Sequence, residues 1–591
     1  MIVPMKKVFV VTRASEREAL LGALRDLGVL HLEPADPSAA APEQLRSALR
    51  RVQQAEQALA AVAPSGEAPD LSASEAAEEV LTITRRVEEH RSRLAALYRE
   101  AEGIRMWGDL RRDRLDALAE AGLEVRFYAV PAEDAGEVRG ECVERLGDLP
   151  GGRVLVAVAR REGAPDVPDS AELLSPPRRD RPTILAEARR ADEALAADMR
   201  RLGELAHLAE KLEAERRRLA SEVAFAAALA GGMQEADLFG VQGWAPAGRA
   251  ETLADDLARQ GIAAGVDTRE PAPGEQPPTL IGYPAWARPI KGLFDMLGTV
   301  AGYREFDVAA PFMIALPIFA AMLIGDGGYG LVLLLGPALA YRRAARMLGA
   351  EFTRLLLVVG GAAVAWGLLN GSFFGVVLYD PVIPVDMSEQ SRNLVMRISF
   401  YMGAVHLSLA QLWAGVALWP SLKMLSKVGW AVFVWGMLGV VKYFVLNDAY
   451  FLDPSTPWPY LLGAGAALAI VFASPSRNPA KMLGVGLAGF PLSMLSTFSD
   501  VISYVRLMAV GLASGVLAAS FNELAVQSGT WIIGVPVLVA GHALNIGLCV
   551  IALFAHGVRL NMLEFSNNLG MQWGGYAYQP FAYVRPEETT A

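Results

Sequence analysis

Two arginines lie inside segments that are otherwise apolar, and of all residues in this chain they are the best placed to do chemistry. Arg506 occupies the middle of the stretch 496–514, and Arg559 recurs in the last hydrophobic segment. An arginine at the centre of a membrane helix costs about 2.5–3.5 kcal/mol on insertion scales, so it faces protein or water. Because a guanidinium stays protonated, it can only hold, repel or exchange an anion. Two such cations in neighbouring segments indicate an ion pathway.

Helical spacing places further polar side chains beside Arg506. With about 3.6 residues per turn, its side of the helix is small and polar, which lets a second helix or another protein approach closely. The residues on this side are Ser499, Ser503, Ala513 and Ser520. The alternative is an arginine held only for structure, by Asp500 or by a backbone carbonyl. Asp500 lies about 120° away around the helix, so it is not an obvious partner.

The last hydrophobic segment repeats this construction around Arg559. The same spacing groups Asn545, Ala552, His556 and Leu563 with it. His556, one turn from Arg559, either lines a proton path or is a hydrogen-bonded core histidine, whereas we expect His542 to be a core residue. Glu564, near the end of the segment, is either a proton relay or a salt-bridge partner. Glu523, at the opposite end of the preceding segment, is a candidate for the outer part of a path.

Other kinds of chemistry lack the residues they need. The sequence contains no phosphate-binding loop of the pattern G-x-x-x-x-G-K-[ST], no metal cluster and no nucleophile elbow. We therefore expect no cofactor and no metal, and any ATP must be handled by a different chain. Cys142 and Cys549 fall in different halves of the chain, which argues against a disulfide. A net charge of −10 over 591 residues gives no nucleic-acid footprint.

The charges divide the chain into a soluble half and a membrane half. Residues 306–591 hold only 14 of the 54 Lys and Arg residues and 13 of the 64 Asp and Glu residues. Their hydrophobic runs, among them 355–378, 398–419 and 532–554, reach the roughly 18–20 residues needed to cross a bilayer. Residues 1–11 do not resemble a signal peptide, so we expect the first half to stay in the cytoplasm.

The first half, residues 1–280, is predicted to be a dumbbell of two small α/β lobes joined by a long antiparallel coiled coil. Its long Ala-, Leu-, Glu- and Arg-rich helices, 73–121 outward and 182–230 back, each need a partner to bury an apolar stripe. We expect a proximal lobe at about 1–40 and 236–270, a coiled-coil arm at about 42–122 and 180–231, and a distal lobe at about 123–165, in which strands 123–130 and 153–159 flank a helix at 133–146. The alternative is a generic helical scaffold.

The second half is predicted to be an α-helical membrane domain at 309–591, reached through a linker and interfacial helix at 281–308. Breaking the run 309–341 at 325–330 into a hairpin keeps the following arginines cytoplasmic, as the positive-inside rule requires; a partly re-entrant hairpin is the alternative. About eight crossings follow, two of them long and tilted, with both ends cytoplasmic. The seventh, within 481–527, must tilt, kink near Pro491 or begin along the surface.

Five segments resemble the a subunit of rotary V-type ATPases, called subunit I in bacterial and archaeal V/A-type machines. They are Gly-Asp-Gly-Gly-Tyr-Gly at 325–330, Trp-Gly-Leu-Leu-Asn-Gly-Ser-Phe-Phe-Gly at 366–375, Ser-Tyr-Val-Arg-Leu-Met-Ala at 503–509, His-Gly-Val-Arg-Leu-Asn-Met-Leu-Glu-Phe at 556–565 and Tyr-Gln-Pro-Phe-Ala-Tyr at 578–583. The resemblance covers the whole chain. It implies a multi-pass protein of the cell inner (plasma) membrane.

The resemblance also implies a function and partners. It places Arg506 on the family's essential arginine and Arg559 on its companion, facing the carboxylates of a rotating proteolipid ring. Such a stator forms two offset proton half-channels and couples proton translocation to ATP synthesis or hydrolysis in other subunits. Peripheral-stalk subunits on the distal lobe, the central-rotor cap subunit and membrane lipid are the other expected partners. The anion that answers Arg506 is then expected outside this chain.

The sequence departs from many relatives at two positions, and two rival functions remain. Ser514 stands where the family often has a histidine, and Cys549 where it often has a glutamate, which leaves the outer half-channel to Glu523, water or backbone groups. The rivals are a stand-alone ion-coupled transporter and a non-conducting anchor of a complex. A transporter usually shows internal repeats, and this sequence has no convincing repeat.

Overall fold

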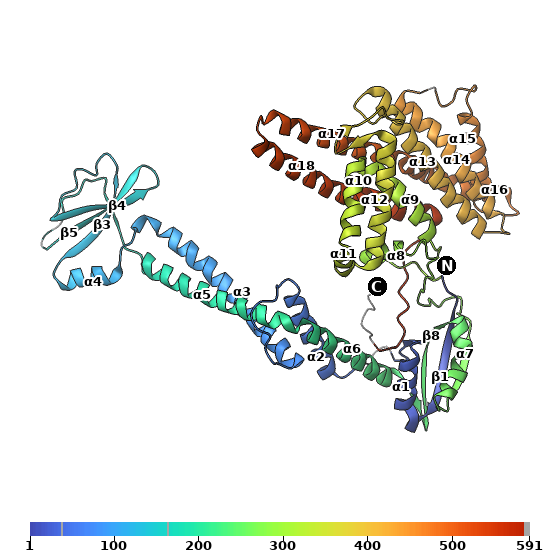
Figure 1. Cartoon of the computed structure of the whole chain (residues 1–591), viewed down its shortest axis with the longest axis horizontal. Helices are drawn as coiled ribbons and strands as arrows, with labels where there is room; N and C mark the ends of the chain where they lie inside the picture. The colour runs from blue at the N-terminus through green and yellow to red at the C-terminus, as the bar shows by residue number, and fades with distance from the viewer. Residues whose placement is uncertain (37–39, 162, 164, 449, 584–591) are drawn as a thin grey trace.

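The computed structural model describes residues 1–36, 40–161, 163, 165–448 and 450–583. Figure 1 shows a helical bundle, a small α/β lobe next to it, and a second small lobe that long paired helices hold far from both. Small parts of the predicted domains, at 37–39, 162, 164, 449 and 584–591, lie outside the described residues.

The lobe beside the bundle, here the proximal lobe, is an antiparallel sheet with two helices on it. Its strand order is β2-β8-β1-β9, with β7 on β8. The inward side chains of β1, among them Val8 and Val10, pack against Leu20 and Leu24 of one helix and Leu253 of the other, as the alternation of a half-buried strand requires. The elements are β1 (Met5–Arg13), α1 (Arg17–Leu27), β2 (His31–Glu33), β7 (Met233–Glu235), β8 (Leu238–Pro246), α7 (Ala247–Arg259) and β9 (Gly265–Arg269).

Paired helices lead away from the proximal lobe. Glu79 forms an ion pair with Arg201, and Asp198, further back along the returning helix, with Arg86, so α3 and α5 run antiparallel. The predicted outgoing helix, 73–121, is wrong beyond Gly103: a short 3-10 turn and the separate helix α4 (Arg112–Glu120) follow, because glycine ends helices readily. The helices are α2 (Glu43–Leu59), α3 (Ala73–Gly103), α5 (Arg181–Leu205) and α6 (Ala209–Gly231).

The far lobe is a four-stranded antiparallel sheet of order β4-β5-β3-β6. The predicted helix at 133–146 is wrong, because 142–149 forms a strand that pairs with β5. Two glycines weaken the helix locally, and a Cβ at one of them, Gly140, would lie 2.4 Å from the Val158 side chain. The strands are β3 (Glu124–Pro131), β4 (Cys142–Leu149), β5 (Arg153–Arg160) and β6 (Glu172–Leu174).

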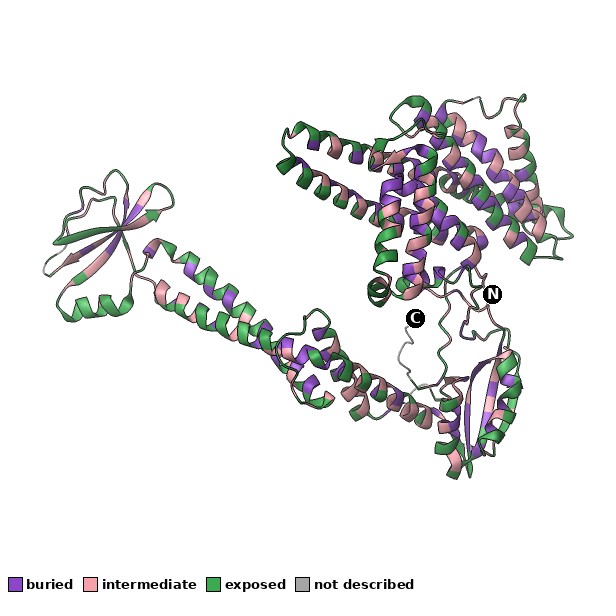
Figure 2. Cartoon of the chain, in the orientation of Figure 1, coloured by how far each residue is buried: buried purple, intermediate pink, exposed green. Residues whose placement is uncertain are grey.

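The bundle is built from apolar helices that bury their inner sides against one another (Figure 2). Within the described residues, four helical runs are long and apolar enough to cross a membrane: Ala350–Asn370, Lys423–Leu446, Pro479–Gln527 and Trp531–Leu569. The helices are α8 (Ile290–Leu297), α9 (Ala309–Ile324), α10 (Gly327–Leu339), α11 (Tyr341–Leu348), α12 (Ala350–Asn370), α13 (Glu389–Ala417), α14 (Lys423–Leu446), α15 (Trp458–Val471), α16 (Pro479–Ser503), α17 (Val505–Gln527), α18 (Trp531–Ala552) and α19 (Ser566–Leu569).

Two interruptions shape this bundle. The predicted break in 309–341 is present: α9 ends at Gly325, and Asp326 caps α10 by accepting a hydrogen bond from the Tyr329 N–H. The long run 479–527 passes Pro491 as helix and is interrupted at Tyr504 instead. The Tyr504 side chain is buried, and its hydroxyl bonds His406 of α13 at 2.7 Å, so tertiary packing fixes the break there.

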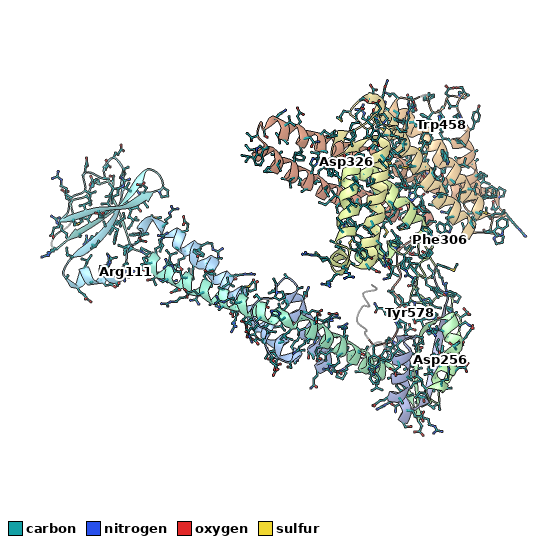
Figure 3. All side chains as sticks on the ribbon, viewed as in Figure 1. Arg111, Asp256, Phe306, Asp326, Trp458 and Tyr578 are labelled. Atoms are coloured by element: carbon teal, nitrogen blue, oxygen red, sulfur yellow. The ribbon has the colours of Figure 1, made fainter. Side chains whose placement is uncertain are left out.

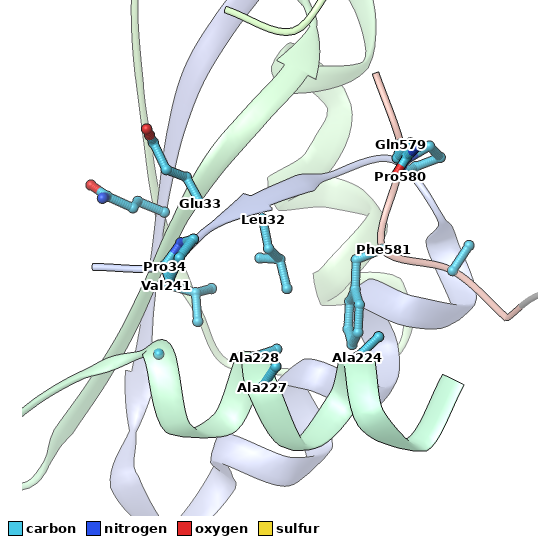
Figure 4. A pocket seen from close by; sticks show the side chains of 13 residues that line it. Leu32, Glu33, Pro34, Ala224, Ala227, Ala228, Val241, Gln579, Pro580 and Phe581 are labelled. Atoms are coloured by element: carbon cyan, nitrogen blue, oxygen red, sulfur yellow. The ribbon is translucent and has the colours of Figure 1, made fainter. Parts of the chain in front are cut away.

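Residues 571–583 return to the proximal lobe as an extended strap, and Figure 3 shows Tyr578 between that lobe and the bundle. The Gln579 N–H donates to His31 Nδ1 and the Phe581 N–H to the Leu30 carbonyl. The Phe581 ring is buried in the core of the proximal lobe beside a cavity of about 450 Å³ (Figure 4). The strap therefore ties the last helix of the bundle to the first strands of the chain.

We expect the strap to loosen at acid pH. Burial lowers the pKa of the His31 imidazole below its ordinary value of 6.5, and only the neutral ring accepts the Gln579 N–H. The docked state therefore binds fewer protons than the undocked state, so docking is fully stable above about pH 6.5 and weakens as the pH falls through the lowered pKa. Hydrogen exchange at 578–583 in the detergent-solubilised full chain, corrected for its intrinsic pH dependence, should rise between pH 7.5 and 5.5.

The matched control is His31→Asn, which should abolish this pH dependence, while Phe581→Ala should raise exchange at both pH values because it removes a buried ring. Glu33 beside His31 opposes the shift without reversing it. Equal protection of the strap at both pH values in the native chain would contradict the assignment.

Candidate functional site

Arg506 and Arg559 share one carboxylate, Glu564, and we call these three residues the Arg–Glu–Arg cluster. Nη2 of Arg506 lies 3.3 Å from Oε1 of Glu564, and Nε of Arg559 lies 3.6 Å from the same oxygen. The side chain of Glu564 is 6% exposed, against 25% for Arg506 and 52% for Arg559. The expectation that the anion of Arg506 lies outside this chain is incomplete, because the chain itself supplies one.

A π-helical stretch brings Glu564 to the arginines. Helix α18 continues beyond Ala552 through two π-helical segments, Leu553–Val558 and Leu560–Phe565. In a π-helix the backbone hydrogen bonds join residues five apart, so side chains five positions apart lie above one another. This places Glu564 next to Arg559. The prediction that His556, Arg559 and Leu563 share one side of the helix assumed a regular α-helix. It is wrong because the regular α-helix ends at Ala552. Neither proline nor any other sequence signal marks this change of register.

The turn at Tyr504 also lies within the group of residues that was predicted to share one side of the helix with Arg506. Ser499 is exposed, whereas Ser503 is buried and its Oγ donates to the Asp500 carbonyl at 2.7 Å. Both belong to α16, while Arg506 belongs to α17. The turn at Tyr504 is a single residue with helical dihedral angles (φ −71°, ψ −12°) inside the run Pro479–Gln527, so the predicted grouping of these residues with Arg506 stays a prediction.

Asp500 joins a chain of amide groups and makes no ion pair with Arg506. Its Oδ2 accepts a hydrogen bond from Asn568 Nδ2 at 3.0 Å, and the same nitrogen donates to the Glu564 carbonyl at 2.6 Å. Gln411 of α13 in turn donates to Asn568 Oδ1. These contacts support the backbone that carries Glu564. The alternative in which Asp500 holds Arg506 is therefore not the arrangement in the structure.

A second polar network lies further along α17 and α18. Asn545 Nδ2 donates to the Tyr329 hydroxyl and to the Ser514 carbonyl, both at 2.9 Å. The Tyr329 hydroxyl also bonds His542 Nδ1 at 2.8 Å, and His542 Nε2 bonds Asn522 Oδ1 at 3.0 Å. Because Asn522 Nδ2 donates to the Phe374 carbonyl, Asn522 Oδ1 accepts from the Nε2–H of His542, and in that tautomer Nδ1 accepts from the Tyr329 hydroxyl. The network joins three helices and carries two groups able to exchange protons.

The remaining predicted residues are less connected. Glu523 is exposed and accepts a hydrogen bond from Gln527 one turn away. His556 is half-buried, and its Nδ1 is enclosed without a hydrogen-bond partner among the described residues. At the two positions that differ from many relatives, Ser514 Oγ and Cys549 Sγ lie 3.1 Å apart. The structure thus brings Asn545 into a network and leaves Glu523 at the surface.

Asp326 is a buried charged residue that residue-by-residue reasoning missed. It is fully buried, and its two oxygens accept four hydrogen bonds: Oδ1 from the Tyr329 and Phe374 N–H groups, and Oδ2 from the Ser372 hydroxyl and the Gly375 N–H. These four hydrogen bonds join the start of α10 to the loop after α12. The sequence did offer a signal for this contact, because Asp326 lies in the motif 325–330 and its partners 372–375 lie in the motif 366–375.

The fold and the site together define a class: a membrane protein with a charged cluster inside an apolar helical bundle and a large α/β and helical part outside it. The chain is homologous to subunit I of V-type and A-type ATP synthases. It is 27% identical to V-type ATP synthase subunit I of Borreliella burgdorferi over 618 residues, covering 99% of this chain and 100% of that protein. It is 29% identical to V-type ATP synthase subunit I 1 of Treponema pallidum over 637 residues, covering 98% and 100%.

A more distant relative is A-type ATP synthase subunit I of Archaeoglobus fulgidus, 25% identical over 409 residues and covering 59% of each chain. Among solved structures, the cytoplasmic N-terminal domain of subunit I, homolog of subunit a, of V-ATPase matches 44% of this chain and 99% of that chain, at 20% identity and a TM-score of 0.19. No family model matches the chain.

Replacement of Asp326 by Asn should destabilise the bundle. The amide nitrogen of the new side chain would face the Tyr329 and Phe374 N–H groups in one orientation and the Gly375 N–H in the other, so we expect a loss of about 1–3 kcal/mol. The measurement is thermal unfolding of the purified chain in detergent. The control is Asp453→Asn, since Asp453 accepts from the Ser455 N–H in an exposed loop. Equal unfolding temperatures for the two variants would show that the four hydrogen bonds of Asp326 add no stability.

A methyl group at Gly511 should separate α9 from α17. A Cβ there would lie 2.1 Å from the Met322 carbonyl oxygen, whereas a Cβ at Gly515 would meet nothing within 4 Å. We therefore expect Gly511→Ala to cost about 1–3 kcal/mol, and Gly515→Ala, on the same helix, to be neutral or to gain up to about 1 kcal/mol from helix propensity. Thermal unfolding in detergent compares them, and a harmless Gly511→Ala would contradict the close contact.

Proposed function

We propose that this chain is the stator subunit of a rotary V/A-type ATPase, in which it forms two offset proton half-channels against a rotating proteolipid ring. Other subunits carry out ATP synthesis or hydrolysis. The observation that carries the proposal is the Arg–Glu–Arg cluster, two partly exposed guanidiniums on one buried carboxylate within a chain homologous to subunit I along its whole length. A fixed cation at a membrane-embedded surface is what a passing carboxylate requires.

The physical basis of the mechanism is the response of a carboxylate to its surroundings. A ring carboxylate is neutral while it faces lipid, because desolvation disfavours its charged form, and it ionises beside a fixed cation. Arg506, with Arg559 beside it, would hold the deprotonated site and prevent protons from passing directly between the half-channels. Rotation of the ring is then the only route across. Each charge moved through 100 mV supplies about 2.3 kcal/mol.

The two polar networks supply candidates for the half-channels. On the inner side these are Asp500, Glu564 and His556, with the exposed Ser499 and the buried Ser503 of α16. On the outer side they are Asn545 and its network, with Glu523 exposed beyond them. His542, expected to be a core residue, joins the outer candidates because both of its ring nitrogens are hydrogen-bonded within that network.

The course of the chain supports about eight crossings with both ends cytoplasmic. The bundle begins after α8 next to the proximal lobe, and the strap returns from α19 to that lobe, which requires an even number of crossings. The proposed crossings are α9, α10, α12, α13, α14, α15, the pair α16 and α17, and α18. The paired helices and the far lobe then extend into the cytoplasm as a coiled-coil dumbbell, where peripheral-stalk subunits bind the far lobe and the rotor cap lies near the proximal lobe.

Replacement of Arg506 by Ala should abolish proton transport. Without the fixed cation a ring carboxylate has nothing to hold its charge, so we expect ATP-driven proton uptake in proteoliposomes of the whole complex to fall to background, with the complex intact. The matched control is Arg354→Ala, which removes an arginine paired with Glu351 at the start of α12. Uptake at the normal rate in an assembled Arg506→Ala complex would favour a non-conducting anchor.

If the chain were a stand-alone transporter, it would need no other subunit. Purified chain alone in proteoliposomes should then move ions without ring or ATPase subunits. We expect no such flux, and flux by the isolated chain would overturn the stator.

A further inference from the structure

The Arg–Glu–Arg cluster carries an odd number of charges. Two guanidiniums and one carboxylate leave one net positive charge, and among the described residues Glu564 is the acid that pairs with either arginine. Asp500 of α16 is hydrogen-bonded to Asn568 instead. The buried side of the cluster therefore holds the anion, while the more exposed side presents cations.

The contacts of Glu564 leave it able to release an arginine. Both arginines approach the same oxygen, Oε1, and neither makes the paired contact of a fork-shaped ion pair. The second oxygen, Oε2, is buried and has no hydrogen-bond partner among the described residues. A single-oxygen contact of 3.3 Å is long for a charge-assisted hydrogen bond. Arg506 is thus neutralised without being locked.

We propose that Glu564 is an internal counter-anion that holds Arg506 and Arg559 as a pair with one net positive charge, so that the site takes one external carboxylate at a time and lets it go. This inference rests on the proposed function and assigns Glu564 a positioning role instead of a place in a proton relay. When a ring carboxylate arrives, Arg506 turns to it; when that carboxylate leaves as the neutral acid, Arg506 returns to Glu564.

The charge count explains why such a residue is needed. Without Glu564 two guanidiniums would face each other in a low-dielectric bundle, where like charges repel strongly and a bound carboxylate is held strongly. The ring would then bind but release slowly. With Glu564 and without Arg559, the remaining pair is neutral and attracts a carboxylate weakly. A cluster with one net positive charge attracts a carboxylate and still releases it.

The test compares single and double variants in the reconstituted complex. We expect Glu564→Gln to slow ATP-driven proton uptake by about tenfold or more, and Arg559→Gln alone to slow it as well. The double variant Glu564→Gln/Arg559→Gln restores one net positive charge and should be faster than either single variant. The control Glu351→Gln removes a carboxylate from the Arg354 pair and should keep the normal rate.

Each outcome separates this inference from its rivals. A double variant no faster than Glu564→Gln would overturn it and return Glu564 to a proton-relay or purely structural role, because neither role is rescued by removing a positive charge. A normal rate in Glu564→Gln would overturn it too. Both results leave the stator intact as long as Arg506→Ala abolishes uptake, whereas uptake in Arg506→Ala overturns the stator itself.

Discussion

The sharing of one buried carboxylate by two arginines is the interaction on which the helical bundle depends. Charged side chains inside an apolar bundle are costly unless each finds a partner, and Arg506 and Arg559 come from different helices. Their common partner Glu564 therefore joins α17 to the end of α18. The π-helical register and the amide chain through Asn568 both support that contact.

The surrounding contacts keep this cluster in place by joining short segments to long ones. Asp326 binds the start of α10 to the loop after α12 through four hydrogen bonds, and the carbonyls of α9 approach α17 at a glycine that no other residue can replace without movement. Helices α9 and α10 are too short to cross a bilayer comfortably alone. Packing against α12 and α17 gives them the burial that their own length does not.

How far the sequence could predict this structure depends on the range of the interactions. The break at 325–330 followed from charge placement, because the arginines that signal it lie nearby in the sequence. The strand at 142–149 was missed because its pairing with β5 outweighs its local preference. Arg506 and Glu564 were each singled out, but their contact depends on a π-helical register that no residue type announces.

The junction between the bundle and the proximal lobe completes the mechanical argument. Three segments from the start, middle and end of the chain meet there: Ile2 pairs with Ile281, Thr279 pairs with Ala577, and the strap continues onto Leu30. A single connecting segment would swivel about its backbone dihedrals, whereas three hydrogen-bonded segments cannot turn independently. In the proposed stator, torque on the bundle is thereby passed to the proximal lobe and the paired helices beyond it. In that proposed stator, a cation held beside a moving ring needs such a joint as much as it needs its carboxylate.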